Sequence, residues 1–248
     1  MVDKEELKNL LRELRSEEDL SKVKEKAREI LKNVDPKVLS LAEQELVEEG
    51  MSREELRKLC DIHLELLSGS ITKVEGGMKP THPITILKEE HEIILENLNN
   101  LERVLKKVKN SKNFGEIEKE LEQLEAIAHV LLDAESHHGR EEKALFPRLE
   151  KHGITGPPSI MRMEHTDLRK RKKALGKLVE DRGNMSYREF ADKLNEVGSY
   201  LLKMLTDHIF KENNILYPTA LESLKDSEWN EIKTEFDDIG YCCFTPRK

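Results

Sequence analysis

Apolar side chains recur every three or four positions along most of this chain of 248 residues, which is the period of an amphipathic helix. Four long stretches carry the pattern, at about 83–109, 115–146, 158–182 and 186–217. Each stretch ends in a segment rich in Gly, Pro or Asn, and we expect Pro147 to end the second and Pro218 the fourth. We find no strand pattern. Long helices joined by short loops predict an all-α fold, an up-down-up-down four-helix bundle.

Shorter helices with clear start and stop signals precede these stretches. Pro36 follows Asp35, which predicts an N-cap with proline at the first helical position. Gly50 is placed to end that helix. Ser52 and Glu55 have the spacing of a capping box, which predicts the start of the next helix.

These signals divide the chain into three parts. We predict a small N-terminal helical domain of unknown function at 1–75 and the four-helix bundle at 76–222, joined through a linker rich in Gly and Pro. The remaining residues, 223–248, are expected to form a C-terminal tail. One helix should start near Ser227 in this tail and carry its apolar residues Trp229, Ile232 and Phe236.

A pattern of histidines and glutamates occurs twice in the predicted bundle. Each copy has one histidine, then a second histidine on the next helix with a glutamate four residues after it. The two copies are His91, His137 and Glu141, then His165, His208 and Glu212. The segments HHGREEKALFP (137–147) and HIFKENNILYP (208–218) align without a gap. Because residues four apart share a helix face, six polar side chains are expected to point into one bundle core.

These polar side chains interrupt the apolar face of their helices. In the fourth stretch the inward positions are Leu201, Leu205, His208, Glu212 and Leu216. A buried polar group costs roughly 2–7 kcal/mol unless it is paired, hydrogen-bonded or bound to a metal. Imidazoles and carboxylates together suit iron, manganese or zinc, and bridging carboxylates with redox use favour iron. The repeat therefore predicts a two-metal site.

The register of the second long helix has an alternative. His138 and Glu142 are also four residues apart, and the spacing of the leucines in this helix would point His138 inward. A mixed pair, His137 with Glu142, is a third arrangement. The internal repeat favours His137 and Glu141, and Glu142 stays an alternate metal ligand.

Composition narrows the class of protein. Charged residues make up 37% and aromatic residues 4% of the chain, which is typical of long amphipathic helices. The formal net charge of −8 argues against a nucleic-acid partner held by positive charge. We find no apolar run of membrane-spanning length, no signal-peptide core and no disulfide framework among three cysteines. We therefore expect a cytoplasmic protein without a membrane partner.

Four motifs resemble those of the hemerythrin-like, His-His-Glu cation-binding domains, over residues 82–218. They are HPITILKEEH (82–91), HHGREEKALFP, MEHTDLR (163–169) and HIFKENNILYP. Within that family they resemble the bacterial iron-centre repair proteins. The resemblance implies two iron ions with an oxo or hydroxo bridge, with manganese or zinc as alternatives. His91 and His137 would serve one ion, His165 and His208 the other, and Glu141 and Glu212 would bridge them.

Two departures separate the chain from the oxygen-carrying hemerythrins. Those proteins carry a further histidine four residues after the third-helix histidine, where this chain has Arg169. They also use a carboxylate five residues after the fourth-helix histidine, where this chain has Asn213, with Glu212 one position earlier. Fewer histidine ligands argue against reversible oxygen carriage and leave both irons more open.

We therefore expect a di-iron protein that senses oxygen, nitric oxide or redox state, or handles iron for the repair of iron centres. The alternatives are a di-iron enzyme acting on nitric oxide or peroxide, and a helical scaffold with structural metal. The segment around Cys60 and His63 resembles an uncharacterised helical domain that often precedes hemerythrin-like domains. Those two residues are one turn apart, as two metal ligands could be, although a buried thiol is the commoner explanation. A protein partner could bind through this N-terminal domain.

Overall fold

A computed structural model describes residues 4–16, 36–52 and 79–246, together with the single positions 27, 29, 30, 34 and 55. Within these residues every regular element is helical, which confirms the all-α prediction. The chain forms two compact units. The first comprises residues 1–77, 146–162 and 210–228, and the second comprises 78–145, 163–209 and 229–248.

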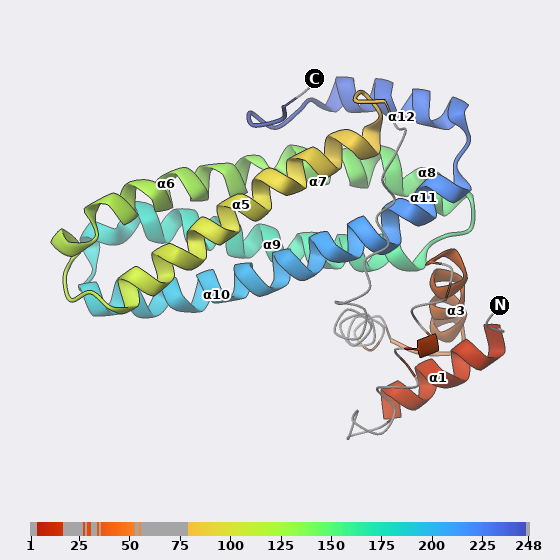
Figure 1. Ribbon diagram of the computed structural model, residues 1–248, viewed down its shortest axis with the longest axis horizontal. Coiled ribbons are helices and arrows are strands. Elements are labelled where there is room, and N and C mark those ends of the chain that lie inside the picture. The colour runs from red at the N-terminus through yellow and green to blue at the C-terminus, as the bar shows by residue number, and fades with distance from the viewer. Residues whose placement is uncertain are drawn as a thin grey trace. The chain divides into compact units, whose positions relative to one another are not determined.

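The second unit is built on four helical segments. They are α5 (Pro83–Lys109), α6 (Glu118–Asp133) with its continuation α7 (Glu135–Arg140), most of α9 (Gly156–Glu180) and most of α10 (Tyr187–Lys211) (Figure 1). Short 3-10 turns, η2 (Phe114–Glu116) and η4 (Asp181–Asn184), lie in two of the connections. The predicted four-helix bundle is therefore confirmed.

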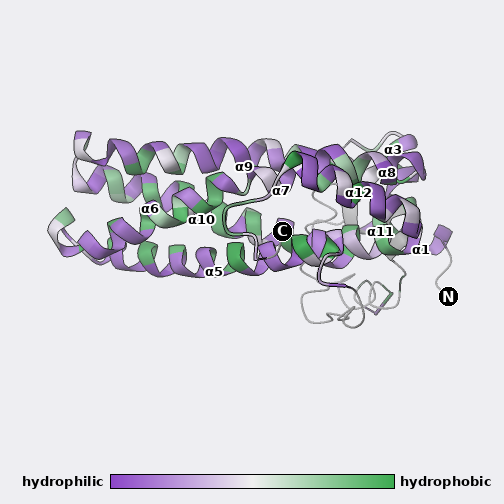
Figure 2. Cartoon of the chain, turned by 90° about the horizontal axis from the view of Figure 1, so that it is seen from above, coloured by the Kyte–Doolittle hydropathy of each residue, from purple (hydrophilic) through white to green (hydrophobic). Residues whose placement is uncertain are grey.

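The core of the bundle takes apolar side chains from all four segments. Leu101, Leu124, Leu175 and Leu201 are fully buried there. Hydrophobic and hydrophilic residues alternate along each long helix in Figure 2, as the helical period of the sequence predicts. No helix among the described residues is long and apolar enough to cross a membrane.

The C-terminal tail forms one helix, as predicted. This helix, α12 (Asp226–Ile239), buries Trp229, Ile232 and Phe236. The ring of Trp229 lies 4.7 Å from the ring of His82, whose Nδ1 accepts a hydrogen bond from the backbone N–H of Ile84. His82 therefore starts α5 as its N-cap.

The second and fourth helices continue beyond their predicted ends, each through a π-helical turn. The turn η3 (Glu141–Leu145) leads into α8 (Phe146–Lys151), and η5 (Glu212–Leu216) leads into α11 (Tyr217–Ser223). The chain thus stays helical through Pro147 and Pro218, so the expectation that these prolines end the helices is wrong. A proline lacks an N–H and clashes with the carbonyl four residues before it. A π turn, whose hydrogen bonds reach five residues back, relieves both problems.

The first unit contains the described helices of the N-terminal part, α1 (Lys4–Ser16) and α3 (Pro36–Glu48). These helices pack against each other through buried apolar residues. The buried ammonium of Lys8 lies 3.1 Å from a carboxylate oxygen of Glu45 and 2.5 Å from one of Glu49. In the same unit α3 also packs against η5 and α11.

The predicted helix signals of the N-terminal part are present. α3 starts at Pro36, and after its last turn Gly50 has a φ of 106°, a left-handed conformation that favours glycine. The backbone N–H of Ser52 donates to Glu55 at 2.8 Å, and the backbone N–H of Glu55 donates to the Ser52 hydroxyl at 3.2 Å. This reciprocal pair is the predicted capping box.

Candidate metal centre

Four buried histidines face one another in two pairs inside the bundle. Nε2 of His91 on α5 lies 3.1 Å from Nε2 of His137 on α7. Nε2 of His165 on α9 lies 3.0 Å from Nε2 of His208 on α10. Each of the four side chains is at most 1% exposed. Each helical segment of the bundle therefore contributes one imidazole.

Glu141 lies between the two histidine pairs. The same oxygen, Oε2, lies 3.5 Å from Nε2 of His137 and 3.5 Å from Nε2 of His165. The side chain is fully buried and opens the π turn η3. One carboxylate oxygen is thus within reach of both imidazole pairs.

Glu212 is the corresponding carboxylate of the second copy. It follows His208 by four residues along a continuous helix, opens η5 and is fully buried. Like Glu141, it therefore occupies the first position of a π turn. All six residues of the repeated pattern are thus buried.

Two carboxylates that the sequence argument did not single out orient these imidazoles. Oε2 of Glu90 accepts a hydrogen bond from Nδ1 of His137 at 2.7 Å, and Oε2 of Glu164 accepts one from Nδ1 of His208 at 2.8 Å. Such bonds fix the tautomer that leaves the Nε2 lone pair available to a metal. Glu90 and Glu164 directly precede the first histidine of each copy. The repeated Glu-His pair in the sequence could therefore have identified both carboxylates.

The same hydrogen bonds keep Glu90 ionised. Burial alone would raise the pKa of this carboxyl group. The hydrogen bond from His137 and the charges of His137 and Arg140 outweigh burial and lower its pKa to about 2. Glu90 is therefore an anion that accepts the hydrogen bond from Nδ1 of His137.

Glu142, the alternate ligand of the sequence argument, contacts the outer nitrogen of a histidine. Its Oε1 lies 2.8 Å from Nδ1 of His165, and its Oε2 accepts a hydrogen bond from Arg169 at 3.0 Å. Burial would raise the pKa of Glu142, but the hydrogen bonds from His165 and Arg169 lower it to about 2. Arg169 stands at the position where the oxygen carriers have a further histidine. Its hydrogen bond holds Glu142, the carboxylate that contacts His165.

Both candidate histidines of the second helix are buried. α6 ends at Asp133 and α7 begins at Glu135, so the helix is interrupted at Ala134 just before the two histidines. His138 stacks on His165 with ring centroids 3.9 Å apart, and its ligand nitrogen lies within 4.8 Å of those of His165 and His208. Burial, and then the charge of His165, holds the pKa of His138 well below its usual range.

The donor set fits a metal ion. Two ligand nitrogens bonded to one metal at ~2.1 Å and at a right angle are about 3.0 Å apart. The facing Nε2 atoms lie 3.0 and 3.1 Å apart. Imidazole with carboxylate is the ligand chemistry of iron, manganese and zinc. Such a donor set is typical of helical bundles that bind cations.

Comparison with protein families agrees with this class. The hemerythrin HHE cation-binding domain model matches residues 82–220, and a family of unknown function (DUF438) matches residues 7–73. The chain therefore belongs to the hemerythrin HHE cation-binding family, with a separate domain before it, as the motifs predicted. It is a metal-binding protein of a kind that usually holds iron. A search of curated proteins found no match to the chain. Cys60 and His63 lie outside the described residues.

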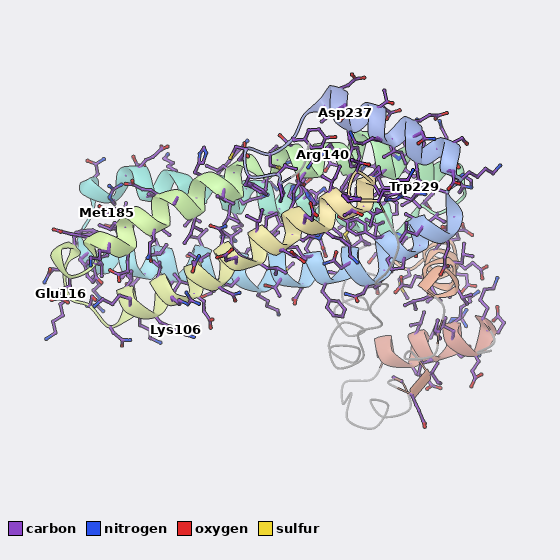
Figure 3. All side chains as sticks on the ribbon, turned by 45° about the horizontal axis from the view of Figure 1, so that its top comes forward. Lys106, Glu116, Arg140, Met185, Trp229 and Asp237 are labelled. Atoms are coloured by element: carbon purple, nitrogen blue, oxygen red, sulfur yellow. The ribbon has the colours of Figure 1, made fainter. Side chains whose placement is uncertain are left out.

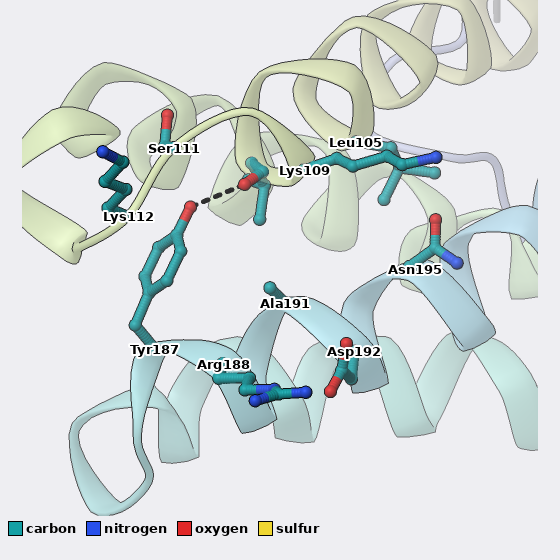
Figure 4. Close-up of a pocket in the computed structure, with 10 residues that line it drawn as sticks. Leu105, Lys109, Ser111, Lys112, Tyr187, Arg188, Ala191, Asp192 and Asn195 are labelled. Carbon is teal, nitrogen blue, oxygen red and sulfur yellow. Dashed lines mark hydrogen bonds between the residues drawn. The ribbon is translucent and has the colours of Figure 1, made fainter.

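A surface pocket lies apart from this cluster. It has a volume of about 470 Å³ and lies between the end of α5 and the start of α10 (Figure 4). Tyr187 lines it and donates a hydrogen bond to the carbonyl of Val108 at 2.7 Å. Its cationic lining residues are Lys109, Lys112 and Arg188. None of the predicted metal ligands lines this pocket.

Proposed function

We propose that the chain binds two iron ions and responds to oxygen, nitric oxide or redox state. His91 and His137 would hold one ion, and His165 and His208 the other. Glu141 and Glu212 would bridge them. The observation that carries the proposal is the pair of facing Nε2 contacts, at 3.1 and 3.0 Å, with Glu141 Oε2 at 3.5 Å from one nitrogen of each pair.

The surrounding residues suit such a role. Bound iron would supply one-electron redox chemistry and open positions for a diatomic ligand, which hemerythrin-like domains often bind. Glu90, Glu142 and Glu164 hold the outer nitrogens of three histidines, so the inner nitrogens stay oriented without the metal. Buried apolar residues of the bundle flank the cluster and limit the access of water. Arg169 adds no ligand, which favours sensing or redox chemistry over reversible oxygen carriage.

Packing inside the first unit favours sensing over iron delivery. Helix α3 of the N-terminal part contacts η5, the turn that begins with Glu212. A change in the coordination of Glu212 could therefore alter the packing of α3. Such a link from a local charge change to a packed helix is how a ligand switch is read out. The N-terminal domain would then present the change to a protein partner.

The first test measures the metal. Protein produced in iron-rich medium should contain about two irons per chain, with near-ultraviolet charge-transfer bands. Glu141→Ala and Glu212→Ala should each lose these bands. Glu92→Ala, a control beside His91 on the exposed face of α5, should retain them. Zinc, or no metal, with unchanged spectra in both variants would refute the di-iron proposal.

The second test addresses sensing. Hydrogen exchange of residues 36–48 should differ between reduced protein and protein exposed to oxygen or nitric oxide. The Glu141→Ala and Glu212→Ala variants should show no such difference, because they should lack the di-iron site. Identical exchange in both states of the iron-loaded wild type would argue for iron storage or delivery.

A further inference from the structure

The C-terminal segment, residues 226–246, contacts the carboxylate that orients His137. This segment lies beyond residues 82–220, which match the cation-binding domain. The hydroxyl of Thr245 donates a hydrogen bond to Oε1 of Glu90 at 2.5 Å. Oε2 of the same carboxylate accepts from Nδ1 of His137 at 2.7 Å and from the guanidinium of Arg140. Both oxygens of Glu90 are therefore held.

Arg140 is itself held by the C-terminal segment. Its side chain is fully buried, and its guanidinium lies 5.4 Å from the ring centre of Phe236 and 4.8 Å from that of Tyr241. It also donates a hydrogen bond to the carbonyl of Gly240 at 3.4 Å. Figure 3 shows Arg140 beside the helix that carries Trp229 and Asp237. The segment thus supplies both a cover for Arg140 and a direct hydrogen bond to Glu90.

A carboxylate held at one oxygen can still rotate about its terminal bond. Glu90 is held at both, so its orientation toward His137 is fixed. Outer partners of this kind set the ring orientation and basicity of a ligand histidine, and their loss costs about 10–100-fold in metal affinity. The effect of the segment should therefore reach the metal position of His91 and His137.

We propose that Thr245 and Arg140 are positioning residues for this metal position, acting through Glu90, and that the C-terminal segment controls how fast its metal leaves. This inference rests on the proposed two-iron site. Arg140 has a counterpart in the second copy of the repeat, the equally buried Lys211. Thr245 lies outside the repeat and beyond the residues that match the family domain.

The test uses the full chain loaded with iron(II) without oxygen. Release to a coloured chelator in excess is followed for wild type, Thr245→Val and Thr245→Ser. Valine keeps the shape of threonine but cannot donate a hydrogen bond, whereas serine keeps the donor. Thr245→Val should release one of the two irons about tenfold faster, the lower end of the outer-partner range, with the second iron unchanged. Thr245→Ser should release both at the wild-type rates.

Two further measurements keep the outcomes distinct. Thermal unfolding of each iron-free variant checks that the fold is retained, and Arg140→Lys should accelerate the same release phase as Thr245→Val. Wild type that loads two irons, with Thr245→Val releasing at the wild-type rate, would overturn this inference alone. Equal acceleration of both phases would also overturn it. Wild type that takes up no iron would overturn the proposed function and this inference together.

Discussion

His138 offers the sharpest test of which histidines bind metal. Its ligand nitrogen lies close to those of His165 and His208, so distance alone would admit it as a ligand. The two stacked rings of His138 and His165 argue otherwise. Their centroids are 3.9 Å apart and their planes are inclined by only 11°. We expect His138→Phe to keep both irons.

The geometry of the stack gives the reason. An imidazole binds a metal in the plane of its ring, through the nitrogen lone pair, at ~2.1 Å. A metal midway between two parallel rings would lie up to about 1.9 Å out of each plane, nearly the whole bond length. Neither lone pair would then point at the metal. In this arrangement His138 and His165 do not share a metal ion.

Stability gives a second readout for the same variant. Nδ1 of His138 is buried with no hydrogen-bond partner, and Oε2 of Glu135 is 4.0 Å away from it. Leaving a buried polar atom unsatisfied costs about 1–3 kcal/mol. Phenylalanine removes that atom and keeps an aromatic ring on His165. The free energy of unfolding of the iron-free protein should therefore be unchanged or up to about 1 kcal/mol higher.

The assay combines iron content per chain, the near-ultraviolet spectrum and denaturant unfolding. His137→Phe is the matched control, because it makes the same change at the neighbouring position. This control should lose iron and its charge-transfer bands. A His138→Phe protein that lost one iron, or whose bands shifted as those of the control do, would refute the argument from ring stacking.

An exposed thiol, a buried ammonium and an outer carboxylate give three further tests. In a Cys60→Ser chain, an aromatic disulfide reagent should label the exposed Cys243 without unfolding. Cys242, whose pKa burial raises to about 12, should react only after unfolding, as mass spectrometry would show. Lys8→Glu should lower the thermal stability of α1 and α3, and Glu49→Lys in the same chain should restore part of it. Because the hydrogen bond from Lys8 lowers the pKa of Glu49, that stabilisation is present above pH 4.5 and lost as the pH falls below it, which hydrogen exchange would follow. Glu164→Gln should weaken iron binding about 10–100-fold in competition with a chelator, with no change in circular dichroism.

The bundle was predictable because its signals are local. The expected first helix, 83–109, has the bounds of α5. Near the expected start of the fourth helix, the Ser186 hydroxyl accepts a hydrogen bond from the backbone N–H of Glu189 at 3.3 Å. The inward positions of the fourth helix are also buried, including Leu201, His208 and Leu216. Helical period and capping depend on neighbours within a few residues, so one sequence is enough to read them.

The register of the second helix was not predictable from a uniform period. If the second helix were one uninterrupted α-helix, its period would point either His137 or His138 inward and the other outward. Both are buried, and both lie just after the interruption of the helix at Ala134. Such a departure can rotate the residues after it relative to an ideal helix. A uniform helical period assumes an uninterrupted helix, so the sequence could favour one histidine but could not show that both are buried.

The contacts around Glu90 depend on distant parts of the chain. Arg140 follows Glu90 by 50 residues and Thr245 follows it by 155. No spacing rule connects positions so far apart, and the fold alone brings them together. The adjacent residues Glu90 and His91 illustrate the limit. Their repetition as Glu164 and His165 was visible, but the role of each glutamate appears only when the histidine of the next helix is placed.

The two π turns connect the sequence repeat to the proposed chemistry. Each begins at a glutamate proposed to bridge the metals, Glu141 or Glu212, and each ends before an aromatic-Pro pair. π turns are rare, because an ordinary α-helix is more stable. Where they do occur, they are often at functional sites. The following proline disfavours the ordinary helix at that point, because it removes one hydrogen bond and clashes with the carbonyl four residues back. The prolines therefore offset the cost of a turn that redirects the glutamate, which explains why the repeat extends beyond the His and Glu to the closing aromatic-Pro pair.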